Sequence, residues 1–129
     1  MSDDMIRALA KNGGVIHINF GCEFLSQKSA DTSSWTGPKG YKGKTVPAAL
    51  ADVVAHIDHA VKVAGIDHVG IGSDFDGVGC VPTGLEDVSK FPSLTRALLE
   101  KGYSPEDIGK IYGGNFLRLM RAVENAAKH

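Results

Sequence analysis

An amphipathic helical pattern between two short apolar runs is the feature that most constrains the fold. Residues 47–64 carry an apolar stripe at helical spacing, made of Leu50, Val53, Val54, Ile57, Val61 and Ala64. Runs rich in β-branched residues flank this helix at 15–20 and 68–73, and each has the length of a strand. Strand, helix and strand in this order predict a βαβ unit with a parallel strand pair and a right-handed connection.

Helix signals also lie on both sides of this unit. Ser2 suits the N-cap of a first helix, which residues 12–14 (Asn-Gly-Gly) end. A short helix around Leu94 to Leu99 stops at Gly102, and Ser104 with Pro105 begins another, which Gly113 and Gly114 break. A last helix is expected after an Asn115 cap, with an inward apolar side of Phe116, Met120 and Val123.

Residues 26–46 are expected to form a long polar loop. The segment holds four lysines, three glycines, Trp35 and Tyr41. A solvated surface excursion is the favoured interpretation, although loops of this length inside compact domains are often functional.

Composition excludes some functions and leaves others open. The formal net charge of −1 offers no electrostatic attraction to nucleic acid or an anionic membrane. No apolar run approaches the ~20 residues of a membrane span. A length of 129 residues suits one domain, 1–129. Cys22 and Cys80 each follow an expected strand, which leaves a disulfide open, but two reduced thiols are favoured.

The end of the second strand is the strongest candidate for a functional loop. Residues 70–79 read Gly-Ile-Gly-Ser-Asp-Phe-Asp-Gly-Val-Gly, which places Asp74 and Asp76 directly after an apolar strand. An acid at the carboxyl end of a buried parallel strand, with glycines beside it, is typical of a site. An acidic turn with Asp74 as a cap is the structural alternative. The spacing fits neither a phosphate-binding glycine loop nor an EF-hand calcium loop.

The histidines give no metal-site pattern. His56 and His59 lie on the polar side of the central helix without a third ligand, so solvated or capping roles are favoured. His17 is interpreted as a packing residue in the first strand.

Several motifs in order resemble the C-terminal third of the membrane (renal) dipeptidases, zinc peptidases of the metal-dependent amidohydrolase superfamily. These motifs are His56-Ile-Asp-His59, Gly65 to Gly77, Pro82-Thr-Gly-Leu-Glu-Asp-Val88 and Gly114-Asn-Phe-Leu-Arg118. The match runs from about Ser2 to Glu124.

The resemblance implies an α/β fold that is the C-terminal part of a TIM-type (β/α)8 barrel, with about two parallel strands, the seventh and eighth, and flanking helices. It also implies a parent enzyme with two zinc ions that hydrolyses small dipeptides. The family's metal ligands and its substrate-binding arginine would all precede the matched region. The chain is therefore expected to be a fragment that binds no zinc and is inactive alone.

The resemblance assigns a catalytic role to Asp74, which would exchange protons with water and the leaving amine or accept a hydrogen bond from a substrate ammonium group. Asn19 and Phe24 are expected to contact substrate, and Asp76 and Gly77 to set loop geometry.

The partners would be a dipeptide and either an N-terminal half or a second copy. The rival hypothesis is a non-catalytic association module. No leader sequence is visible. We lean toward a cytoplasmic location but leave the location open, because the true N-terminus is expected to be missing.

Overall fold

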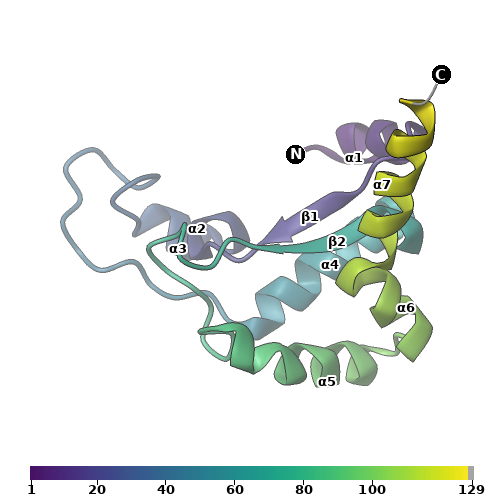
Figure 1. Cartoon of the computed structure of the whole chain (residues 1–129). Helices are drawn as coiled ribbons and strands as arrows, with labels where there is room; N and C mark the ends of the chain where they lie inside the picture. Colours follow the sequence, from purple (N-terminus) through teal and green to yellow (C-terminus); the bar gives the residue numbers. More distant parts are fainter. Residues whose placement is uncertain (128–129) are drawn as a thin grey trace.

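The computed structural model describes residues 1–127 and contains the expected βαβ unit with helices around it (Figure 1). No helix within this range is long and apolar enough to cross a membrane. The elements, in order, are α1 (Asp3–Lys11), β1 (Ile16–Asn19), α2 (Cys22–Leu25), α3 (Gln27–Asp31), α4 (Leu50–Ala64), the 3-10 turn η1 (Ile66–His68), β2 (Val69–Ser73), η2 (Val88–Lys90), α5 (Phe91–Lys101), α6 (Pro105–Gly109), the π turn η3 (Lys110–Gly114) and α7 (Asn115–Ala126).

The two strands pair in parallel, as the sequence predicts. Ile16 lies opposite Val69 and Ile18 opposite Ile71, but a register shift after Ile18 places Asn19 opposite Ser73. The side chains alternate, so Ile18 is buried in the core while His17 on the other face is exposed. Both strands run toward α2 and the long loop, which lie at their carboxyl ends in Figure 1.

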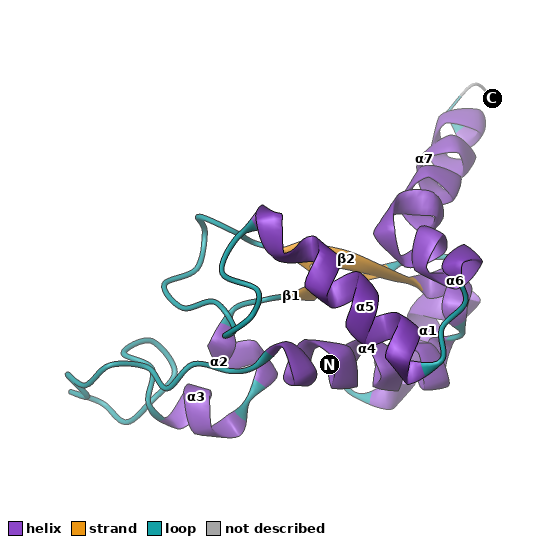
Figure 2. Ribbon diagram, turned by 90° about the horizontal axis from the view of Figure 1, so that it is seen from below, coloured by secondary structure: helices purple, strands orange, loops and turns teal. Residues whose placement is uncertain are grey.

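Helix α4 lies against both strands and separates them from α5 (Figures 1 and 2). Its stripe enters the core as predicted, with Val53 and Ile57 completely buried. The helix begins at Leu50 rather than at residue 47, because Ala48 and Leu50 hydrogen-bond with the backbone of Thr83 and hold this stretch extended.

Asp58 on α4 ties this helix to the segment after α5. Its carboxylate lies 2.7 Å from Lys62 Nζ and 3.5 Å from Lys101 Nζ, and it accepts a hydrogen bond from the Tyr103 hydroxyl. The hydrogen bond from Lys62 is the main cause that lowers the pKa of Asp58. Partial burial, with the negative charge of Asp58 beside it, raises the pKa of Tyr103 to about 12, so the phenol remains a donor at neutral pH.

The C-terminal helices begin and end close to the predicted positions. Helix α5 ends at Gly102, which has φ of 102° in the left-handed region. Ser104 and Asp107 form a capping box at the start of α6. Non-helical backbone at Gly113 separates α6 from α7.

The expectation for α7 is wrong in two respects. Asn115 does not cap the helix; its buried amide donates hydrogen bonds to the carbonyls of Ile66 and Val69 at 2.7 and 2.8 Å. The apolar residues expected inward are instead exposed, with Phe116 at 49%, Met120 at 47% and Val123 at 60%. Helical periodicity identifies an apolar face but not what covers it, and here Asn115 and not that face anchors the helix.

The long polar loop is partly helical. The short helices α2 and α3 were not predicted, and α3 occupies the first residues of the 26–46 segment. Ser26 caps α3, and its hydroxyl accepts the hydrogen bond from Ser29 N. The remaining loop is held at its base by the Thr32 hydroxyl, which accepts a 2.9 Å hydrogen bond from Val46 N. Helices this short carry too few residues for a periodic signal.

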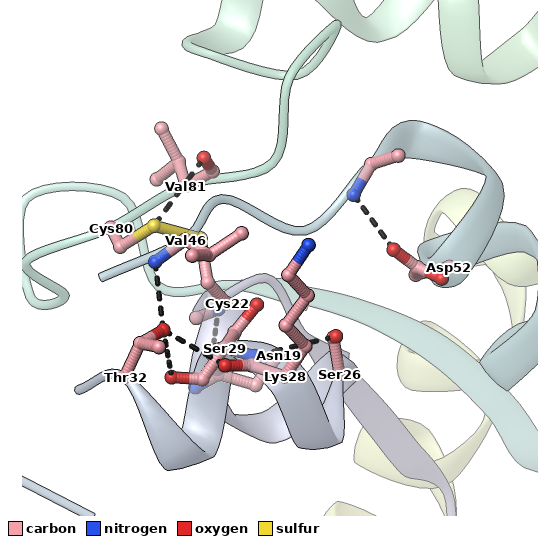
Figure 3. The surroundings of a disulfide bond; sticks show 12 residues. Asn19, Cys22, Ser26, Lys28, Ser29, Thr32, Val46, Asp52, Cys80 and Val81 are labelled. Carbon is pink, nitrogen blue, oxygen red and sulfur yellow. Dashed lines mark hydrogen bonds between the residues drawn. A yellow bond between two sulfur atoms is a disulfide. The ribbon is translucent and has the colours of Figure 1, made fainter. Parts of the chain in front are cut away.

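Cys22 and Cys80 form a disulfide (Figure 3), so the favoured expectation of reduced thiols is wrong. Their Cα atoms are 5.5 Å apart, and Cys22 N also donates a 3.1 Å hydrogen bond to Cys80 O. The residues follow the carboxyl ends of neighbouring parallel strands, which brings them together although they are separated by 58 positions. The presence of only two cysteines does not predict a disulfide, whereas their positions after neighbouring strands favour one.

Reducing the disulfide should destabilise the chain. It closes a loop of 58 residues, and the chain-entropy model gives ~4 kcal/mol for a loop of this size. Urea unfolding of the oxidised chain with and without reductant should therefore show a clear drop in midpoint. The Cys22→Ala/Cys80→Ala double variant should resemble the reduced chain and no longer respond to reductant. An unchanged midpoint on reduction would contradict a disulfide that contributes to stability.

Candidate active site

The parallel strand ends bring Asn19 and Asp74 into contact. Asn19 Nδ2 donates a 2.7 Å hydrogen bond to Asp74 Oδ2, and Asn19 Oδ1 accepts a 2.7 Å hydrogen bond from Gly21 N. The register shift contributes to this arrangement because it pairs Asn19 with Ser73, the residue before Asp74. Since both ends of the amide are engaged, Asn19 holds the Asp74 carboxylate in a fixed orientation.

The backbone that carries Asp74 is strained. Ser73, Asp74 and Asp76 have φ of 29°, 64° and 67°, in a region that non-glycine residues rarely adopt. Gly77 closes the turn, with Gly77 N donating to Asp74 O at 3.1 Å, and a Cβ atom at position 77 would collide with Asp74 Oδ1. Strain of this kind is often concentrated at functional sites. Any larger residue at position 77 would push the Asp74 carboxylate out of this position.

A cavity of about 400 Å³ opens beside Asp74. Its lining comes from α2, from the long loop and from the segment after β2, and comprises Glu23, Phe24, Ser33, Ser34, Trp35, Thr45, Asp74, Gly77, Val78, Gly79 and Cys80. The predicted residues Asp74 and Phe24 therefore share one cavity. Glu23 and Trp35 were not singled out from the sequence. A lone tryptophan in a polar loop was the available signal for Trp35.

Asp76 faces a different cavity from Asp74. This second cavity, of about 390 Å³, is lined by Phe75, Asp76, Val78, Val81 and residues 86–88. The two acids of the motif are thus separated, although they are only one residue apart in sequence.

Each histidine within residues 1–127 contacts a separate partner. His56 Nε2 lies 3.1 Å from Leu25 O at the end of α2, and His59 Nε2 lies 2.8 Å from Asp3 Oδ1. His68 contacts Gly14 O at 2.8 Å. His17 lies 3.0 Å from Ile71 O and contacts the Phe116 ring edge-on. His56 and His59 thus have the capping and solvated surroundings that the sequence predicts.

The whole chain, residues 1–129, matches the family model of the membrane dipeptidases, peptidase family M19. The chain belongs to the membrane dipeptidase family. Dipeptidase aclJ of Aspergillus oryzae is 39% identical over 126 residues, and dipeptidase ataJ of Aspergillus terreus is 41% identical over 127 residues. Each alignment covers 98% of this chain, but the chain spans only 26–27% of the length of these relatives.

Solved structures agree with this membership. A metallopeptidase from Rhodobacter sphaeroides, liganded with a phosphinate mimic of L-Ala-D-Ala, matches with a TM-score of 0.76 and 28% identity over 94% of this chain. The probable dipeptidase PvdM from Pseudomonas aeruginosa matches with a TM-score of 0.75 and 30% identity over 92% of this chain. The chain corresponds to 30% and 39% of those two structures, respectively.

The residues that the structure describes do not assemble the metal centre of a metallopeptidase. Zinc requires three or more His, Cys, Asp or Glu ligands around one point. Between Met1 and Ala127 no such group occurs, and the cysteines are engaged in the disulfide.

The purified 129-residue chain is therefore expected to hold no stoichiometric zinc after dialysis against a weak chelator. The four histidines of the described range are too dispersed to share an ion, so single-histidine binding should be weak and reversible. Metal analysis by mass spectrometry, with a zinc titration monitored by calorimetry, provides the measurement. One tightly held zinc per chain would refute the expectation.

Proposed function

We propose that this chain forms the C-terminal part of the TIM-type barrel of a dipeptidase, with β1 and β2 as its seventh and eighth strands. The observation that carries the proposal is the placement of Asp74. Its carboxylate lies at the carboxyl end of β2, is held by Asn19 and borders the cavity that Phe24 also lines. In TIM-barrel enzymes this end of the strands carries the active site.

Asp74 would serve as the proton carrier in hydrolysis of a dipeptide. A water oxygen attacks the carbonyl carbon of the peptide bond, Asp74 takes a proton from that water, and the same proton passes to the leaving nitrogen as the C–N bond breaks. Asn19 is a positioning residue because it contacts Asp74 Oδ2 rather than substrate in this arrangement. Phe24 contributes an apolar wall to the same cavity.

Catalysis also needs groups that this chain does not provide. The family comprises metallopeptidases, yet the described histidines do not assemble a metal site. The chain also spans only about a quarter of its curated relatives. We therefore assign the metal-binding half of the site to barrel strands outside these 129 residues, encoded elsewhere in the same protein or in a partner.

Asp74→Asn tests the catalytic assignment in a chimera in which residues 1–129 replace the equivalent part of an Aspergillus dipeptidase. Asparagine keeps an oxygen for Asn19 but cannot carry the proton. We expect kcat to fall by ~10²–10⁴-fold, the range for general acid–base groups, while metal content and Tm stay unchanged.

Asp76→Asn is the matched control because it removes the neighbouring acid, which has a similar φ but faces the other cavity. Its kcat should stay within a few-fold of the parent chimera. Equal losses in both variants, or a loss of less than a few-fold for Asp74→Asn, would leave Asp74 with a structural role only.

The surfaces that a complete barrel would cover are open in this chain. The outer sides of β1 and β2 lack strand partners among the described residues, and α7 exposes Phe116, Leu117, Met120 and Val123. Uncovered strand edges and apolar patches favour association. The occupant that fits is the set of remaining barrel strands, because the chain matches only 30–39% of the solved relatives.

The purified chain should therefore self-associate or bind a hydrophobic dye strongly in the absence of that partner. Analytical ultracentrifugation over a concentration series provides the measurement. Addition of the N-terminal part of an Aspergillus relative should convert the aggregates into a one-to-one complex, whereas Met120→Lys on α7 should weaken that complex. A compact monomer with a cooperative thermal transition would instead favour the non-catalytic association module.

A further inference from the structure

The cavity beside Asp74 is lined by side chains that have no part in the proposed proton transfer. Glu23 and Trp35 line it together with Phe24 and Asp74, and neither has a part in proton transfer. Phe24 is 44% exposed and Trp35 is 71% exposed, although both are large apolar side chains. Their rings lie 5.5 Å apart at 87°, so α2 and the loop after α3 together form one aromatic wall.

The charge of this cavity is entirely negative. Glu23 and Asp74 are its charged lining residues, and no lysine or arginine joins them. Neither carboxylate takes part in any ion pair found within residues 1–127. Asp74 has its hydrogen bond from Asn19, whereas Glu23 lies on α2, one residue from the disulfide, and borders the cavity.

The aromatic wall is built into the fold. A Cβ atom at position 21 would lie 2.8 Å from Phe24 Cδ2, so glycine there allows the ring to fold back against the start of α2. Trp35 N donates to the buried Ser33 hydroxyl at 3.1 Å, which fixes the turn that presents the indole. The cavity also includes Cys80, so the disulfide joins its two sides.

We propose that Glu23, with the Phe24–Trp35 pair, selects dipeptides that carry a positively charged side chain, of the lysine or ornithine type. The aliphatic stem of such a side chain packs on the aromatic rings, and its ammonium group is attracted by their faces and by the Glu23 carboxylate. Asp74 then remains available for proton transfer at the peptide bond. This inference rests on the proposed dipeptidase function, because it names the substrate class for the same cavity.

Trp35 is the one tryptophan of the chain, so its fluorescence reports directly on this cavity. The probes are glycyl-lysine, glycyl-norleucine, which has the same stem without the ammonium group, and glycyl-glutamate. We expect glycyl-lysine to change the emission at a concentration ~3- to 30-fold lower than glycyl-norleucine, with glycyl-glutamate weakest. Equal midpoints for the three peptides, or no change with any of them, would overturn the proposal.

Glu23→Gln should bring the glycyl-lysine midpoint closer to the glycyl-norleucine midpoint and leave the latter unchanged; the preference that remains reports the attraction by the aromatic faces. The matched control is Glu100→Gln, which removes the same charge from an exposed position on α5 and should preserve the preference. A preference that is undiminished in Glu23→Gln, or that falls equally in both variants, would refute the role of Glu23.

The same peptides distinguish this proposal from the catalytic one when they are hydrolysed by the chimera. There Glu23→Gln should raise KM for glycyl-lysine by a similar factor without changing kcat for glycyl-norleucine. An inactive chimera with intact fluorescence binding would count against the dipeptidase function alone, whereas an active chimera with no preference for glycyl-lysine would count against Glu23 alone.

Discussion

The parallel pairing of β1 and β2 is the interaction on which the rest of the structure depends. It aligns the carboxyl ends of two segments that lie more than fifty residues apart, and three further contacts follow there. Asn19 meets Asp74, Phe20 N bonds to Ser73 O, and Cys22 meets Cys80. Each of these would be lost by a one-residue slip, because a slip reverses the face on which every side chain lies.

The disulfide has particular value in a sheet of only two strands. Such a sheet has few backbone hydrogen bonds to fix its register, and isolated pairs of strands are marginal. A covalent link between the segments that follow the two strands opposes slippage at the end of the sheet where Asp74 lies. It also joins α2, which carries Glu23 and Phe24, to the loop that follows Asp74, so the same bond supports both sides of the cavity.

The sequence could predict the elements that bury an apolar face and carry their own caps. The stripe of α4, the cap at Ser2 and the capping box at Ser104 are local signals, and the structure contains them all. The disulfide and the outward face of α7 depend on which segments are neighbours in space. Periodicity shows that Phe116 and Met120 share a face, but the bonds from Asn115 and Arg118 to backbone carbonyls elsewhere in the fold orient the helix so that this face points outward. The short helices α2 and α3 contain too few residues for a periodic signal, and of the two only α3 has a side-chain cap.

The candidate site shows the same division between local and spatial information. An acid after a buried strand identifies Asp74 from the sequence, and period-two alternation suggests Asn19 as its neighbour. Glu23 and Trp35 could not be assigned in this way, because their common cavity is created by the fold of a polar loop over the strand ends. The difference has a chemical consequence. Residues at the strand ends lie in a rigid frame, whereas loop residues can vary without disturbing that frame and so can decide which substrate is accepted. A long loop that carries an exposed tryptophan over an acidic cavity is therefore the part of this chain where selectivity is expected to lie.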